Sequence, residues 1–203
     1  MAINDFVELN LPEAAALADL TGVQFDLQSA KEFALKLREL LSADRPDNSL
    51  VDPLSTATLV RYSRAFVTGV RKPLREEALQ ELSDSQRRKH EYFRNLRDKH
   101  IAHSVNCFEE SVPVARYWIE RVETEGITSI SCNHHVVTGL GSRDLDALVE
   151  LVDLLLRFVK KKIKEEETRL LATVRAMPLA AVLSGDRGPV VPGRGPVNER
   201  RKR

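Results

Sequence analysis

Apolar residues recur at three- and four-residue spacing along most of the chain, which is the pattern of amphipathic helices. The longest series begins at Leu145 and continues to Ile163, and it predicts a helix from Ser142 to about Met177. At about 1.5 Å per residue this helix is roughly 50 Å long, so we expect it to pack on the whole bundle or on a second subunit. Shorter series predict helices over residues 12–21, 28–41, 54–70, 74–82 and 83 to about 103.

One part of the chain has the composition of β-strands instead. Two stretches rich in β-branched and aromatic residues flank the connector Glu123–Gly126, which has the length of a turn. This pattern predicts a β-hairpin over about residues 112–137. Within it, Tyr117 and Trp118 are interpreted as core or interface residues rather than as platforms for stacked bases. The predicted fold class is therefore mainly α, a helical bundle with one inserted hairpin and a long C-terminal helix.

Composition indicates a globular domain followed by a tail. Of the 203 residues, 42% are hydrophobic and 30% are charged, and the length suits one domain with an appendage. We assign residues 1–177 to the helical domain and residues 178–203 to a disordered, basic tail rich in glycine and proline. The formal net charge of +1 is the sum of +4 in residues 184–203 and −3 in the rest. This charge disfavours tight, sequence-independent RNA binding but is compatible with a small, locally positive site.

The sequence also indicates a cellular compartment. No run of 18 uncharged apolar residues is present, and the N-terminus lacks the basic start and apolar run of a signal peptide. Cys107 and Cys132 are too few for a disulfide scaffold and are typical of a reducing cytosol. We therefore expect a cytoplasmic protein without membrane association.

Arginine and histidine are concentrated in the segment HEYFRNLRDKHIAHS, which begins at residue 90. On a regular helix, Arg97, His100 and His103 occupy an arc of about 120° on the apolar face that also carries Phe93 and Leu96. Placing these polar groups there is costly unless they are paired or face a cavity or a subunit interface.

These residue types suit the cleavage of RNA without a metal. Arginine supplies a permanent, forked positive charge that matches phosphate oxygens, and histidine exchanges a proton near neutral pH. Together they can deprotonate a ribose 2′-OH and stabilise the charge that develops on phosphorus. The alternative interpretation of the same spacing is a bundle whose buried polar residues are hydrogen-bonded to one another.

The segment from Arg97 to His103 resembles the R-x(4–6)-H signature of HEPN domains, with five residues between the arginine and the histidine. The polar Asp98 directly after the arginine also fits this family. The sequence RDKHIAHS, followed by a short hairpin and a long final helix, is most similar to the AbiU-type branch, which is tied to abortive infection and toxin–antitoxin systems. The resemblance covers about residues 10–177.

The resemblance implies a dimeric helical bundle that acts as a metal-independent ribonuclease. The Arg97 and His103 side chains of two copies would form one composite site without a cofactor or metal. Arg97 would stabilise the phosphate, His103 would be the general acid or base, Asp98 would orient them, and His100 would line the cleft. The implied partners are a second copy, RNA, and a cognate antitoxin or other partner protein.

One departure from the family concerns regulation. Toxins paired with nucleotidyltransferase antitoxins often carry tyrosine two residues after the motif histidine, whereas Val105 occupies that position here. The alternative function is a non-catalytic HEPN-like module that binds a partner protein or a nucleotide in a defence or regulatory complex.

A zinc site is a competing interpretation of the same histidines. The side chains of His100, His103 and Cys107 lie three and four residues apart, and the hairpin adds a second set of possible ligands. That second set is Cys132, His134 and His135. No C-x2-C pair or HExxH motif is present, and alternation along a strand sends His134 and His135 to opposite faces.

Two further sets of basic residues are candidates for RNA contacts. The first set is Arg157, Lys160, Lys161, Lys162 and Lys164. Because Glu165–Glu167 follow at once, we interpret it as a solvated helix face with intrahelical ion pairs rather than as an RNA groove. The second set is Arg61, Arg64, Arg71, Lys72 and Arg75. It would guide a phosphate backbone if the helix over 54–70 lies beside the motif.

Overall fold

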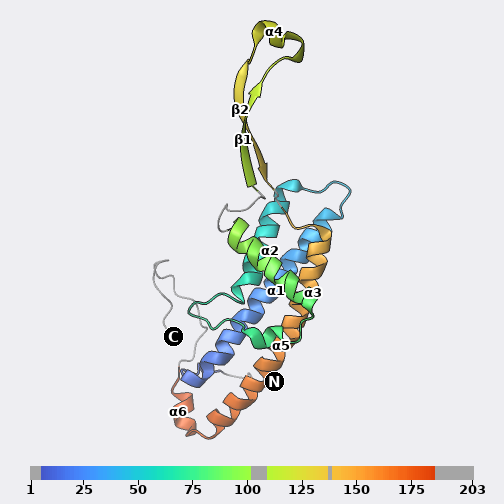
Figure 1. The fold of residues 1–203 in the computed structure, drawn as a ribbon. Coiled ribbons are helices and arrows are strands. Elements are labelled where there is room, and N and C mark those ends of the chain that lie inside the picture. The colour runs from blue at the N-terminus through green and yellow to red at the C-terminus, as the bar shows by residue number, and fades with distance from the viewer. Residues whose placement is uncertain (1–5, 102–108, 137–138, 186–203) are drawn as a thin grey trace.

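The computed structural model describes residues 6–101, 109–136 and 139–185. In these ranges the chain is mainly helical and carries one antiparallel sheet of two strands, which confirms the predicted class. The helices form an elongated bundle, and the sheet projects beyond one end of it (Figure 1).

Three long helices make up the body of the bundle. Helix α1 (Ala15–Leu41) packs against both α2 (Val51–Arg64) and α5 (Ser142–Arg175). One further helix, α3 (Asp84–Leu96), lies across α2 and α5 (Figure 1). The interior of the bundle is filled mainly by leucine and valine side chains from α1 and α5 together with aromatic rings from α2 and α3.

Helix α1 is continuous where two separate helices over 12–21 and 28–41 were predicted, so that prediction of two helices was wrong. The glycine between them, Gly22, costs about 1 kcal/mol relative to alanine but does not end a helix that is packed along its length. Its lack of a side chain leaves room for Arg71, because a Cβ atom there would lie 2.5 Å from the Arg71 Nη1 atom. The helix is preceded by a single 3₁₀ turn, η1 (Pro12–Ala14).

Helix α5 confirms the strongest prediction from the apolar pattern. It extends from Ser142 to Arg175, with Gly141 as its N-cap, and packs along α1. Its buried side chains follow the predicted three- and four-residue spacing. They are Leu145, Leu148, Leu151, Val152, Leu155, Leu156, Val159 and Leu170.

The region from residue 51 to residue 82 departs from the predicted boundaries. Helix α2 follows a 3₁₀ turn, η2 (Asn48–Leu50), and ends at Arg64 rather than near residue 70. It ends early because the chain turns back, so that the Leu74 N–H donates to the Ala65 carbonyl at 2.8 Å. The helix predicted over 74–82 is a single 3₁₀ turn, η3 (Glu76–Leu79).

Helix α3 begins as predicted and ends earlier. Ser83 and Gln86 form a reciprocal capping box, in which each side chain accepts from the other residue's backbone N–H. After Leu96 the chain continues as one π-helical turn, η4 (Arg97–Ile101). The expected regular helix to about residue 103 is therefore wrong over Arg97–Ile101, and residues 102–108 lie outside the described part.

The hairpin is confirmed, but its connection is longer than a turn. Strands β1 (Glu109–Arg116) and β2 (Ser129–Val136) pair in antiparallel register. Between them lie a 3₁₀ turn, η5 (Ile119–Arg121), and the short helix α4 (Val122–Glu125), so the predicted tight turn was wrong. The chain reverses at Gly126, whose φ of 64° is readily adopted only by glycine.

The C-terminal region is helical at its start. Helix α6 (Leu179–Leu183) follows Pro178 and occupies the first residues of the segment predicted as a tail. Residues 186–203 lie outside the described part. Nowhere in the described ranges is a helix both long and apolar enough to cross a membrane.

A buried polar pair joins α2 to α3. The Tyr62 hydroxyl and His90 Nδ1 are hydrogen-bonded at 2.8 Å, and both residues are buried. The His90 ring also packs edge-on against Phe66, with ring centroids 4.5 Å apart. Burial is the main reason that the pKa of His90 falls to about 4, and the positive charge of Arg94 adds to this shift. Burial raises the pKa of Tyr62, so both side chains are neutral across the physiological range.

A buried carboxylate joins α1 to α2 and to the loop that follows it. The side chain of Asp26 is only 1% exposed, and its oxygens accept from Arg61 at 2.8 Å and from Arg71. Arg64 lies 3.3 Å from the same carboxylate. Burial raises the pKa of Asp26, but the hydrogen bonds from Arg61 and Arg71 and the charges of Arg64 and Arg71 lower it further, so the net pKa is below 3.8.

The Tyr62–His90 pair predicts a loss of stability in mild acid. Because the pKa of His90 is about 4 when folded and 6.5 when unfolded, only the unfolded state gains a proton between these values. The free energy of unfolding should therefore fall by about 3 kcal/mol as the pH drops from 7 to 4, from this residue alone. Urea titrations at several pH values measure the loss. It should be smaller in His90→Gln, and an unchanged pH dependence in that variant would contradict the assignment.

The Asp26 cluster predicts a large effect from one uncharged substitution. Asp26→Asn should lower the free energy of unfolding by about 3 kcal/mol, because three guanidinium groups lose their shared counter-charge. Asp146→Asn is the matched control, since this carboxylate pairs at 3.2 Å with Arg38 at the surface. That variant should lose less than about 1 kcal/mol. The folded-state pKa of Asp26 is lowered. Its contribution to the free energy of unfolding is therefore complete above about pH 4 and disappears as the pH falls through that lowered pKa. Equal losses of unfolding free energy in the two variants would contradict this interpretation.

Candidate functional site

The candidate motif begins where α3 changes to the π turn. Arg97 is the first residue of η4, which packs against α2 and α3. The chain leaves this turn at the end of the bundle from which the hairpin projects (Figure 1). A π turn holds one more residue than an α turn, so side chains after Leu96 do not follow the angular spacing of a regular helix. The regular-helix geometry from which the common arc was predicted therefore fails over Arg97–Ile101, and His103 lies outside the described residues.

Arg97 and Asp98 form an ion pair in this turn. The Arg97 Nη1 atom lies 2.8 Å from Asp98 Oδ1, so the predicted orienting role of Asp98 has a contact that can perform it. The Arg97 side chain is 34% exposed and that of Asp98 is 50% exposed. Arg97 is thus half-buried and paired with a carboxylate, so its charge is compensated as a polar group on the apolar face requires. Its guanidinium is accessible to an anion from solvent.

The two motif histidines are only partly within the described structure. His100 lies in η4, and its backbone alone is described. His103 lies outside the described residues, as do Val105 and Cys107. The pairing of Arg97 with His103 therefore stays a prediction from the sequence.

The other histidine of the segment, His90, has a structural role. It is buried against Tyr62 and Phe66, and its lowered pKa keeps it neutral. Sequence analysis did not identify Tyr62 as its partner. The available signal was a hydroxyl and an imidazole on the apolar faces of two neighbouring predicted helices.

The proposed zinc ligands of the hairpin are not gathered into a site. The residues opposite each other in register are Ser111 with His134 and Glu110 with His135, so the two histidines lie on opposite faces as predicted. His134 Nδ1 is hydrogen-bonded to Ser111 Oγ at 2.9 Å, and Cys132 is exposed. In the part of the chain that is described, no three residues of the types histidine, cysteine, aspartate and glutamate are grouped to hold a metal ion.

The basic run late in α5 forms the ion pairs expected of a solvated helix face. Lys162 Nζ lies 3.2 Å from Glu165 and 3.0 Å from Glu77 of η3, and Lys164 pairs with Glu167 at 3.8 Å. Earlier in α5, Asp153 pairs with Lys31 of α1 at 2.6 Å. This pair lies in a groove of about 380 Å³ between the helices. The charges that line the groove are of both signs, so they give it no strong preference for RNA. They are Lys31, Glu32, Asp153, Arg157 and Lys160.

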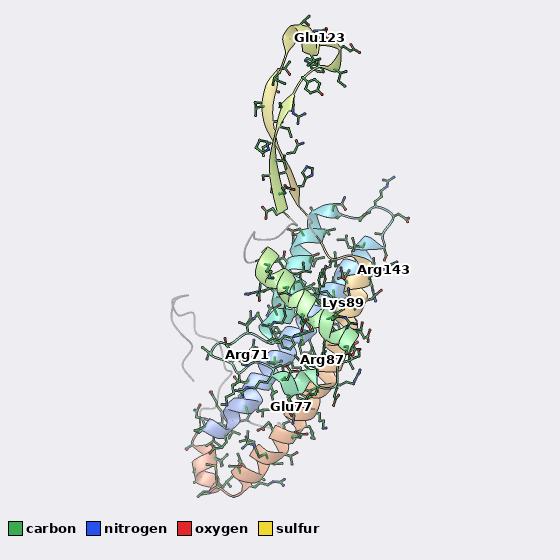
Figure 2. All side chains as sticks on the ribbon, in the orientation of Figure 1. Arg71, Glu77, Arg87, Lys89, Glu123 and Arg143 are labelled. Carbon is green, nitrogen blue, oxygen red and sulfur yellow. The ribbon has the colours of Figure 1, made fainter. Side chains whose placement is uncertain are left out.

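The second basic set has a structural centre that the sequence did not reveal. Three of its members, Arg61, Arg64 and Arg71, converge on Asp26. Sequence analysis missed Asp26, whose only signal was a lone carboxylate among the apolar positions of α1. Figure 2 marks Arg71 at the side of the helical body.

Comparison of the chain with family models, with curated proteins and with solved structures finds no match.

Proposed function

We propose that the chain is a metal-independent endoribonuclease of the HEPN type, with Arg97 and His103 of two copies in one composite site. The observation that supports this most is the position of Arg97 on a π turn, with an accessible guanidinium beside Asp98. Single π turns within helices occur frequently at functional sites. A guanidinium that is held by one carboxylate and open to solvent is suited to bind a phosphate oxygen bidentately.

The proposed reaction uses only side chains of this chain. His103 takes the proton of the ribose 2′-OH, and the 2′-oxygen attacks phosphorus. Arg97 stabilises the negative charge on the pentacoordinate phosphorus, while Asp98 keeps the guanidinium oriented. The bond from phosphorus to the 5′-oxygen then breaks, and that oxygen takes a proton from His103 of the partner subunit. The products are a 2′,3′-cyclic phosphate and a free 5′-hydroxyl. In this proposal His100 would line the cleft between the two copies.

The biological setting belongs to the same proposal. A ribonuclease of this type would act in the cytoplasm as a toxin or a phage-defence effector, and a cognate antitoxin or partner protein would restrain it. Because Val105 replaces the tyrosine that some antitoxins modify, we infer that restraint here does not use that residue.

A second function is favoured by a different observation. The hairpin projects from the bundle and exposes large apolar side chains, among them Trp118 at 65% and Ile119 at 84%. Exposed apolar groups of this size mark interaction surfaces. The second candidate is therefore a non-catalytic HEPN-like module that binds a partner protein or a nucleotide.

RNA cleavage separates the two functions. The purified chain should cleave mixed RNA in excess chelator and leave 2′,3′-cyclic phosphate ends. Arg97→Ala and His103→Ala should each lower the rate by about 100-fold or more, because each removes a group that acts in the transition state. Arg97→Lys should remain impaired, since an ammonium group cannot reproduce the forked contacts of a guanidinium.

The matched control is Arg88→Ala, which removes an exposed arginine from α3, the helix that precedes η4, and should leave the rate unchanged. A wild-type rate no higher than that of Arg97→Ala and His103→Ala would refute the ribonuclease and favour the binding module. Cleavage that chelator abolishes would equally refute the metal-independent mechanism.

A further inference from the structure

The hairpin stands apart from the bundle. Strands β1 and β2 pair with each other, and the hairpin extends into solvent beyond the helices (Figure 1). None of its described residues is buried. A two-stranded hairpin alone is at best marginally stable in water, so a structure of this length is expected to gain support from a further surface.

The hairpin tip, defined as residues 117–127, has a distinct chemistry. Its exposed large apolar side chains are Tyr117, Trp118, Ile119, Val122 and Ile127. The tip also carries three acidic residues and one basic residue, which leaves an excess of two negative charges. Glu123 marks its far end in Figure 2. The tip is thus an apolar surface with a negative charge.

The side of the bundle carries a surface of the opposite charge, which we call the arginine patch. Its basic residues are Arg61, Arg64 and Arg71, which surround Asp26, and the exposed Lys72 and Arg75, which follow Arg71 in the chain. Two carboxylates contact this set, because Asp26 holds three of the arginines and Asp19 accepts from the Lys72 backbone N–H at 3.2 Å. An excess of three positive charges remains.

The arginine patch also has an apolar part. Phe25 is 59% exposed, and the guanidinium of Arg61 lies over its ring, 5.5 Å from the centroid. Val67 and Val70, in the loop between Arg64 and Arg71, are exposed as well. The hairpin tip and the arginine patch are therefore complementary in two respects, since each offers apolar side chains and their net charges are opposite.

Their positions allow contact between two copies. The hairpin leaves the end of the bundle at which α2 begins, and the arginine patch lies at the other end of α2 (Figure 1). Each strand has eight residues and spans about 26 Å, whereas the 14 residues of α2 span about 21 Å. When two bundles lie antiparallel, the hairpin of each copy is long enough to bring its tip to the patch of the other.

We propose that two copies of this chain exchange hairpins, so that the tip of each docks on the arginine patch of the other. The exchange buries the apolar side chains of both tips and pairs their carboxylates with Lys72 and Arg75, which are exposed. The contact is isologous, so it closes as a dimer rather than growing as a filament. It does not depend on the ribonuclease proposal, because docking of the hairpin tips requires no catalysis.

A lipid surface is the competing partner for an exposed tip that contains tryptophan and tyrosine. The negative charge of the tip opposes binding to the anionic leaflet of a membrane, whereas it favours the positive patch. Charge thus decides in favour of a second copy.

Trp118 gives a direct measurement, because it is the one tryptophan in the sequence. As the concentration of the full chain rises to about 100 μM, its emission should shift to shorter wavelength, and sedimentation should report a dimer over the same range. Emission that stays that of an exposed indole while the chain remains monomeric overturns the proposal. A shift that requires phosphatidylcholine vesicles overturns it in favour of a lipid surface.

Charge reversal tests the pairing of the two surfaces. Lys72→Glu with Arg75→Glu should raise the concentration needed for the Trp118 shift at least about tenfold, because like charges then meet across the interface. Adding Glu120→Lys and Glu123→Lys to the same chain should restore it to within about threefold of wild type. A failure of this rescue, with the helical content of all variants unchanged, overturns the assignment of the patch as the docking site.

A matched control shows whether removing any exposed apolar side chain would weaken the dimer. Leu179 in α6 is 71% exposed and lies outside both surfaces. Leu179→Ser should leave the dimer unchanged, whereas Ile119→Ser should weaken it at least about tenfold. Equal effects of the two substitutions would count against docking through the hairpin tip.

Discussion

The buried carboxylate of Asp26 is the constraint on which the arrangement of the helices most depends. A charge in the interior of a bundle is tolerated only when it is paired, and here it is paired with arginines from α2 and from the loop after it. The cluster therefore fixes α2 against α1 and draws the loop across the helix at Gly22, where no side chain obstructs Arg71. The same requirement gathers positive charge on one side of the bundle, because three arginines surround a single carboxylate.

The Tyr62–His90 hydrogen bond in turn holds α3 against α2. It sets where α3 crosses α2, and hence where the π turn brings Arg97 to the edge of the bundle. Two of the chemically versatile residues of the sequence, Asp26 and His90, thus have structural roles, and they place others at the surface. The accessible groups are Arg97 at one end of α2 and the arginine patch near the other. In the two proposals, a phosphate binds at Arg97 and the acidic, apolar hairpin tip of a second copy binds at the arginine patch.

The local residue pattern was sufficient to predict the class of the fold, the long helix α5, the start of α3 and the presence of the hairpin. It failed where distant residues decide the outcome. Packing against α2 and α5 keeps α1 continuous across Gly22, and α2 stops at Arg64 because the Leu74 N–H returns to the Ala65 carbonyl. For the site, the concentration of arginine and histidine singled out Arg97 and the resemblance singled out Asp98, and the two residues form an ion pair. A regular helix was the wrong geometry for them, since periodicity does not distinguish a π turn from an α turn.

The proposed ribonuclease and the proposed exchange of hairpins make one joint claim, that the active species is a dimer. The most direct measurement records the specific rate of RNA cleavage, in excess chelator, at each protein concentration at which the emission of Trp118 is recorded. The account predicts that the rate and the spectral shift rise together, with midpoints that agree within about threefold. Full specific activity at concentrations where Trp118 is still exposed would contradict it.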